Sequence, residues 1–158
     1  VCGAFDERFS LVISNDSGGA GAAIFRGKTG EMVKNFRGGT SGHWFAGNFR
    51  NYVRKEDEMP FDMHFLLSMI APRNLYVCSA KEDLHADPKS EFLSCVAASE
   101  VYHFLGKEGL VADDVIPQNP VTYHDGNIGY HLRDGSHFLS RYDWNKFMEY
   151  RNNEKHIC

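Results

Sequence analysis

The sequence predicts an α/β fold in which a parallel sheet is covered by helices on both faces. Three short apolar runs that suit buried strands alternate with segments of helical periodicity. Clusters of Gly, Pro, Asn and Asp separate these segments, as is typical of the connections between strands and helices. Alternation of this kind favours parallel strands, because each helix returns the chain to the end of the sheet where the next strand begins. Three strands are few for an open sheet, so the pattern indicates the back half of a larger α/β domain.

The elements in the first part of the chain follow from local patterns. The run 11–14 (LVIS) is apolar and β-branched, which predicts a strand buried on both faces. The turn-forming stretch 15–19 ends this strand, and a helix is expected to begin within 20–25. The Gly-rich stretch 26–42 predicts a loop, and the mixture of aromatic and charged residues over 43–54 predicts a short helix.

The second part of the chain continues the alternation. Apolar residues at a 3.6-residue spacing predict a helix over 60–70, which ends before Pro72 because a proline disfavours helix at the residue that precedes it. The following elements are a strand over 74–79, a charged loop over 81–89, a helix over 90–105, a loop over 111–122, a strand over 128–132, a loop over 133–140 and a helix over 141–151.

The composition excludes several classes of function. The chain has 158 residues, of which 42% are hydrophobic, and this is enough to bury one core. Its net charge of −4 argues against a nucleic acid or a membrane surface as partner, and no apolar run reaches the length of a transmembrane helix. The four cysteines fall at no metal-binding spacing, and Cys78 and Cys95 lie in apolar stretches typical of a core. We expect neither a metal nor another cofactor.

Acids and a histidine follow the three predicted strands. Asp16 follows the first, Glu82 and Asp83 the second, and His137 the third. The carboxyl ends of parallel strands share one edge of the sheet, where functional groups gather. An acid followed by a histidine matches the last two members of the serine–acid–histidine order of α/β-hydrolases. The alternative is that Asp16 and Asp83 only cap the helices that follow them.

No serine lies in the setting that a nucleophile of this fold requires. Residues 39–43 (GTSGH) approach the G-x-S-x-G pattern, but the last glycine is replaced by histidine and no strand precedes it. Ser17, in DSGG, is similar to the serine site of chymotrypsin-like proteases, but that fold is all-β and has its histidine upstream. The stretch 19–23 (GAGAA) lacks the full glycine spacing of a dinucleotide-binding turn. The remaining histidines are expected to be surface or core residues.

Four long stretches together resemble one family. They are AFDERFSLVISNDSGGAGAA, HWFAGNF, PFDMHFLLSMIAPRNLYVCSAKEDLHADPKSEF and GYHLRDGSHFLSRYDW. In this order they resemble the C-terminal part of the bacterial glucuronoyl esterases, carbohydrate esterase family 15, some of which are labelled acetyl xylan esterases. The resemblance runs from Gly3 to about Tyr150. It implies that residues 1–158 form a single, partial α/β-hydrolase domain, whose nucleophile elbow and first strands precede Val1.

The resemblance also implies an activity and a set of site residues. Members of the family cleave the ester between 4-O-methyl-glucuronic acid on xylan and lignin alcohols, with a serine, a histidine and a carboxylate and no metal. His137 matches the catalytic histidine, and Asp16 and Asp83 match the two positions at which the family places its acid. Glu31 matches a position that binds sugar hydroxyls. His85 stands where the family usually has a tryptophan that packs on the sugar, so substrate choice is expected to differ.

Two readings of different class follow. The first is the C-terminal portion of a secreted or periplasmic serine esterase that acts on glucuronoyl esters of xylan and is inactive alone, because its serine lies upstream. An acetyl xylan esterase is a variant of this reading. The second is a non-catalytic module that binds carbohydrate or associates with a second copy of itself, since a bare strand edge invites pairing. The partners expected are a carbohydrate ester and either the missing N-terminal half or a second copy.

Overall fold

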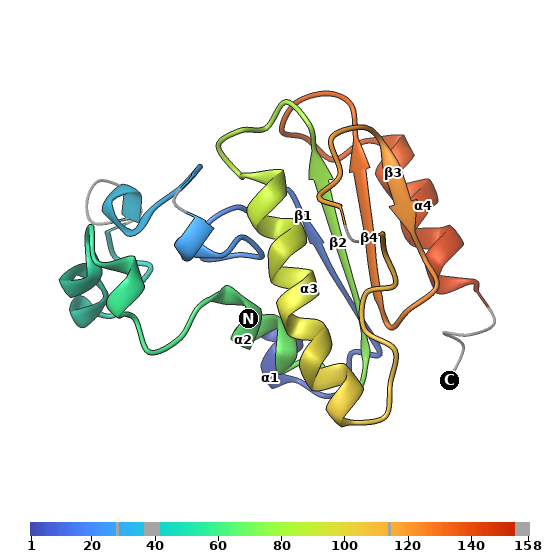
Figure 1. The fold of residues 1–158 in the computed structure, drawn as a ribbon, viewed down its shortest axis with the longest axis horizontal. Coiled ribbons are helices and arrows are strands. Elements are labelled where there is room, and N and C mark those ends of the chain that lie inside the picture. The colour runs from blue at the N-terminus through green and yellow to red at the C-terminus, as the bar shows by residue number, and fades with distance from the viewer. Residues whose placement is uncertain (28, 37–41, 114, 154–158) are drawn as a thin grey trace.

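The computed structural model describes residues 1–27, 29–36, 42–113 and 115–153 and contains one mixed sheet (Figure 1). Its four strands have the order β1-β2-β4-β3. β1, β2 and β4 are parallel, and β3 is antiparallel to β4. The strands are β1 (Leu11–Asn15), β2 (Asn74–Ala80), β3 (Val121–Tyr123) and β4 (Ile128–Arg133). The α/β class is therefore confirmed, and one antiparallel strand is added to the parallel sheet.

Helices cover both faces of this sheet, as the sequence predicts. α3 crosses one face with α2 beside it, and α4 lies on the other face (Figure 1). Within the described residues, none of the helices has both the length and the apolar character needed to cross a membrane. The helices are α1 (Cys2–Phe5), α2 (Met63–Ser68), α3 (Pro88–Phe104) and α4 (Arg141–Arg151).

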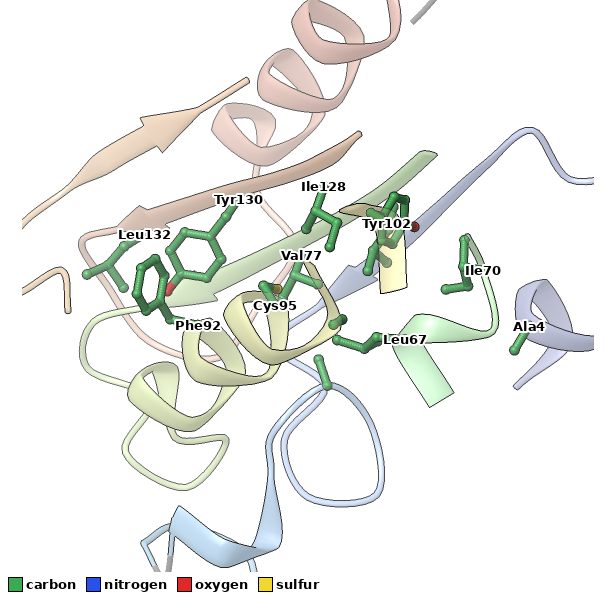
Figure 2. Close-up of a cluster of buried hydrophobic side chains, with 13 residues drawn as sticks. Ala4, Leu67, Ile70, Val77, Phe92, Cys95, Tyr102, Ile128, Tyr130 and Leu132 are labelled. Atoms are coloured by element: carbon green, nitrogen blue, oxygen red, sulfur yellow. The ribbon is translucent and has the colours of Figure 1, made fainter. Parts of the chain in front are cut away.

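The core has two layers because strand side chains alternate between the faces. On the α3 face, Val77 and Tyr130 pack against Phe92 and Cys95 (Figure 2). The buried residues on the α4 face are Tyr76, Cys78, Phe147 and Tyr150. Gly129 in β4 lies against two of these rings, and a Cβ at this position would come within 2.5 Å of the Tyr76 ring. The prediction that Cys78 and Cys95 are core residues is confirmed.

The segment between β1 and α2 forms a smaller cluster beside the sheet (Figure 1). Its short 3-10 turns span Phe25–Gly27, Val33–Phe36, Gly47–Tyr52 and Glu56–Glu58. The buried hydrophobic side chains of this cluster are Phe25, Val33, Phe36, Met59 and, from the start of α2, Met63. The short helix expected over 43–54 is thus present only as the 3-10 turn Gly47–Tyr52.

The helix expected to begin within 20–25 is present only as the 3-10 turn Phe25–Gly27, and tertiary hydrogen bonds explain why. The backbone N–H groups of Phe25 and Arg26 donate to the Asp62 carboxylate at 2.8 and 3.1 Å. The N–H of Gly19 donates to Glu31 at 3.1 Å. These side chains satisfy the backbone from a distance in sequence, so no local helix is needed.

Further boundaries differ from the prediction. The helix expected over 60–70 is shorter and spans Met63–Ser68. The expected loop over 111–122 contains the start of β3, a three-residue strand that depends on its pairing with β4 and leaves no periodic pattern of its own. α3 begins at Pro88, before the expected start at residue 90. The Asp87 carboxylate accepts from the Ser90 N–H, and Pro88 suits the first helical turn because it lacks an N–H.

Candidate active site

The sheet brings the acids and the histidine singled out from the sequence to one edge. β1, β2 and β4 are neighbours and run parallel, so the residues that follow them meet. Asp16 follows β1, Asp83 follows β2 and His137 follows β4. One carboxylate oxygen of each acid and one ring nitrogen of the histidine all lie within 4.8 Å of one another.

Asp83 is the acid in direct contact with the imidazole. His137 Nδ1 and Asp83 Oδ2 are 2.6 Å apart. The His137 side chain is 68% exposed, whereas that of Asp83 is 6% exposed. A buried carboxylate therefore binds an imidazole ring that is exposed to solvent. A carboxylate only accepts, so Nδ1 carries the hydrogen of the neutral ring and Nε2 keeps a lone pair. This arrangement suits a general base that takes a proton through Nε2.

Asp16 lies close to both residues but pairs with Arg133. Arg133 Nη2 donates to Asp16 Oδ2 at 3.0 Å, and both side chains are buried. Burial raises the pKa of Asp16, and the Arg133 charge opposes this rise. The backbone of Asp16 has a φ of 42°, a left-handed conformation in which Asp is tolerated better than most residues. The structure thus places the two candidate acids in different pairings.

Backbone hydrogen bonds join the loop of Asp83 to the loop of His137. The N–H of Lys81 donates to the Arg133 carbonyl at 2.8 Å, and the N–H of Glu82 donates to the Gly135 carbonyl at 3.0 Å. Asp83 Oδ1 accepts from the Ala86 N–H at 3.2 Å. Since both ends of the Asp83–His137 pair are fixed in this way, little reorganisation is needed when a proton moves.

The two residues that the resemblance assigns to substrate binding contact each other. His85 Nε2 and Glu31 Oε1 are 3.0 Å apart, with the His85 side chain 70% exposed. The N–H of Glu31 donates to the His85 carbonyl at 3.0 Å, which ties the two segments together. His85 lies two residues after Asp83, so the pair adjoins the loop that carries the acid.

Glu91 is a buried acid that the sequence analysis missed. It accepts hydrogen bonds from the N–H groups of Ser17 and Gly18 at 2.9 and 3.1 Å and from Ser79 Oγ at 2.6 Å. Burial raises its pKa to about 8. Glu91 therefore fixes the turn after Asp16 from within α3. A signal was available, because Glu91 shares a helix face with Cys95 and Ala98 at the spacing of a buried stripe.

A second set of buried polar side chains, linked by hydrogen bonds, lies under α4. The Asp143 carboxylate accepts from Arg133 Nε at 2.8 Å and from His131 Nε2 at 2.9 Å. His131 Nδ1 then accepts from the Tyr76 hydroxyl at 3.0 Å. Burial lowers the pKa of His131 to about 4, so the ring is neutral. His131 is a satisfied core histidine, as expected. Arg133 was missed, although its place in a strand of buried residues is a signal.

Two clusters of side chains in the described part of the chain have the residue types of a metal site. One is Asp16, Asp83 and His137, and the other is Cys78, His131 and Asp143. In each cluster one carboxylate is already paired with the Arg133 guanidinium. This positive charge opposes a divalent cation at either place.

Of the two serine settings weighed for a nucleophile, the structure describes that of Ser17. Ser17 Oγ bonds to Ser14 Oγ at 2.7 Å and accepts from the Ala22 N–H at 2.8 Å, which gives it a structural role in the turn. Within the GTSGH stretch, residues 39–41 lie outside the described residues. The Ser17 hydroxyl is thus engaged in the turn after β1, while His137 contacts Asp83.

Comparisons with known proteins agree with this picture. A family model described as "Glucuronyl esterase, fungi" matches residues 1–106. Carbohydrate esterase MZ0003, from an unknown prokaryotic organism, is 43% identical over 148 residues, which are 94% of this chain and 34% of that protein. The 4-O-methyl-glucuronoyl methylesterase of Cerrena unicolor is 35% identical over 112 residues, which are 67% of this chain and 24% of that protein.

A solved structure shows the same fold. The glucuronoyl esterase from Solibacter usitatus is 42% identical, with a TM-score of 0.83 that covers 94% of this chain and 37% of that one. The chain thus spans about a third of the length of these relatives, or less.

Proposed function

Because the chain belongs to carbohydrate esterase family 15, the glucuronoyl esterases, we propose that it provides the histidine and the acid of a serine-type esterase. The observation that supports this most is the contact between the exposed His137 ring and the buried Asp83 carboxylate. Residues 1–158 are then part of one α/β-hydrolase domain. The nucleophilic serine belongs to a segment of the protein outside this chain.

The proposed chemistry follows from the free Nε2 of His137. Nε2 takes the proton of the serine hydroxyl while the serine oxygen attacks the ester carbonyl carbon, and the imidazolium formed is stabilised by Asp83. The tetrahedral intermediate then expels the alcohol, which leaves with the proton from Nε2. Water repeats the sequence on the acyl-enzyme, so that serine is regenerated and the sugar acid is released. Asp83 remains a carboxylate throughout and holds the ring in one tautomer.

The proposed substrate is an ester of 4-O-methyl-glucuronic acid on plant cell-wall xylan. Support comes from relatives named 4-O-methyl-glucuronoyl methylesterase. Glu31 and His85 are proposed to contact the sugar, since they lie beside the Asp83 loop. Their mutual contact would hold the His85 ring in place of the larger tryptophan usual in the family. A polymer substrate outside the cell implies that the enzyme is exported.

The proposal is tested with the methyl ester of 4-O-methyl-glucuronic acid. The full-length protein that carries this chain should hydrolyse it, and the 158-residue chain alone should not. An acetylated xylan oligomer serves as the competing substrate. Hydrolysis of the acetyl ester in preference to the glucuronoyl ester would shift the assignment to an acetyl xylan esterase.

Two results would overturn the proposal. Hydrolysis by the 158-residue chain alone would mean that one of its own serines is the nucleophile. A folded full-length protein that is inactive on both esters would favour the non-catalytic reading, which a carbohydrate-binding measurement on the same sample would then examine.

A further inference from the structure

All five N–H groups of the Arg133 guanidinium have acceptors, and three of these acceptors lie in one loop. The loop of residues 134–139, here called the histidine loop, contains His137. Nη1 donates to the carbonyls of Asp134 and Ser136 at 3.2 and 3.1 Å, and Nη2 donates to the carbonyl of Phe138. The two remaining acceptors are carboxylates, Asp16 on Nη2 and Asp143 on Nε.

The three carbonyls belong to alternate residues on both sides of His137. A loop that leaves a strand has no ladder to bind its carbonyl groups, so its conformation depends on other donors. Here a single planar cation supplies them, and its 6% exposed side chain is sealed from water. The Phe138 ring also covers the guanidinium, with 4.5 Å between Arg133 Cζ and the ring centroid. The backbone that carries the imidazole is therefore built around Arg133.

The same guanidinium determines how Asp16 is used. Asp16, Asp83 and His137 are close enough for either acid to approach the ring. Arg133 binds the Asp16 carboxylate, while Asp83 stays free to take the His137 Nδ1–H. The position of Arg133 is itself fixed, because Asp143 binds Ser140 at the start of α4 as well as Arg133.

We propose that Arg133 is a positioning residue of the site, which shapes the histidine loop and engages Asp16 so that Asp83 is the acid that orients His137. This inference rests on the proposed function for its catalytic consequence. Its structural consequences, for the histidine loop and for the His137 ring, can be measured without an activity assay.

The test compares Arg133→Lys with Arg73→Lys. Lysine keeps the charge between the two carboxylates but offers only three donors from one nitrogen, so it cannot serve five acceptors. Arg73 is a matched control because its Nη1 also binds three carbonyls, those of Gly3, Asp6 and Phe9, at 2.8, 3.0 and 3.0 Å. It precedes β2, at the opposite end of the sheet from His137.

The first readout is NMR of the full-length protein that carries this chain. In the wild type the ring nitrogens of neutral His137 should report one tautomer, with the hydrogen on Nδ1. Arg133→Lys should give a mixture of tautomers and make the amides of the histidine loop exchange about tenfold faster or more. Arg73→Lys should change neither. An unchanged tautomer and unchanged exchange in Arg133→Lys would overturn the proposal, as would equal effects of both variants.

A measurement on the wild type tests whether the Arg133 guanidinium is held in place, even if Arg133→Lys does not fold. A guanidinium held by five acceptors cannot rotate about its C–N bonds, so the Nη hydrogens of Arg133 should give separate, slowly exchanging signals. A single averaged signal would contradict the proposal.

The second readout is activity of the full-length protein. A displaced imidazole should lower kcat by about 100-fold and change KM little, because the sugar contacts are untouched. Arg73→Lys should retain its kcat. A raised KM with a normal kcat would contradict a positioning role. If the full-length protein has no esterase activity, the proposed function fails, and the NMR results still decide the role of Arg133.

Discussion

At the scale of single residues, two carboxylates lie near one imidazole, and their partners differ. Asp83 contacts His137 at 2.6 Å, whereas Asp16 contacts Arg133 at 3.0 Å. Asparagine at position 83 would present an amide N–H to Nδ1, and the ring hydrogen would then move to Nε2. In the proposed mechanism, the ring would then lack the lone pair that accepts the serine proton.

We therefore expect Asp83→Asn to lower kcat of the full-length enzyme by about 10³-fold or more. Asp16→Asn keeps an oxygen for Arg133 and should cost less than about tenfold. The measurement is steady-state hydrolysis of the glucuronoyl methyl ester by both variants. A larger loss for Asp16→Asn would show that the acid after β1 supports the histidine.

Glu91 makes the stability of the chain depend on pH. Its pKa in the folded chain is raised to about 8 from the ordinary value of 4.5. The stability that this group contributes is therefore complete below pH 4.5 and is lost as the pH rises through about 8. Relative to Glu91→Gln, the free energy of unfolding of the wild type should fall across this range by at most about 1.4 kcal/mol per pH unit. Urea unfolding of both proteins at several pH values measures this difference, and a constant difference would contradict it.

Single residues also show what sequence reasoning can reach. The three candidate residues, which the structure brings together, were singled out because each follows a strand whose apolar run is visible. Which acid contacts His137 was not predictable, since it depends on Arg133, a residue whose role arises only when the loop folds back over it. The burial of Glu91 could be predicted from its spacing along the helix. The reason for an acid at this position lies in a tertiary partner, the turn after β1.

At the scale of elements, α4 anchors the site through its first turn. Ser140 accepts from the Asp143 N–H at 3.2 Å, and Asp143 accepts from the Ser140 N–H at 2.7 Å, which together form a capping box. The same Asp143 carboxylate holds Arg133 and His131. The start of this helix is thus joined to the buried, hydrogen-bonded side chains beneath it.

Ser140→Ala should lower the free energy of unfolding by about 1 kcal/mol, because one N–H of the first turn loses its acceptor. Denaturant unfolding measures the loss. Ser10→Ala, at an exposed position outside the helices, serves as the control and should have almost no effect. Equal stabilities of the wild type and Ser140→Ala would mean that the cap contributes nothing.

The elements that were predicted well are those whose own residues show a recognisable apolar pattern. β1, β2, β4, α3 and α4 each carry an apolar pattern and were found within a few residues. β3 was missed because three residues paired at the edge of the sheet have no pattern to detect. The helix expected to begin within 20–25 is reduced to the 3-10 turn Phe25–Gly27 for a different reason, since the Asp62 carboxylate binds the N–H groups of Phe25 and Arg26 from 37 and 36 residues away.

At the scale of the whole molecule, β1 lies at one end of the strand order and pairs only with β2 among the described strands. An edge of this kind is a template for further pairing. We expect the 158-residue chain to self-associate as its concentration rises, with light scattering coupled to size-exclusion chromatography as the measurement. Ile13→Lys places a charge on this strand and should favour the monomer. Val115→Lys, at an exposed position outside the described strands, should not. A wild-type monomer at every concentration would contradict the expectation.

The central claim is that His137 is the base of an esterase whose nucleophile lies outside this chain, and activity of His137→Ala in the full-length protein tests it most directly. Hydrolysis of the glucuronoyl methyl ester should fall by about 10⁴-fold or more, with an unchanged fold. Because the His137 side chain is 68% exposed, added imidazole should enter the vacated site and restore part of the rate. A His137→Ala protein with full activity and no response to imidazole would contradict the claim.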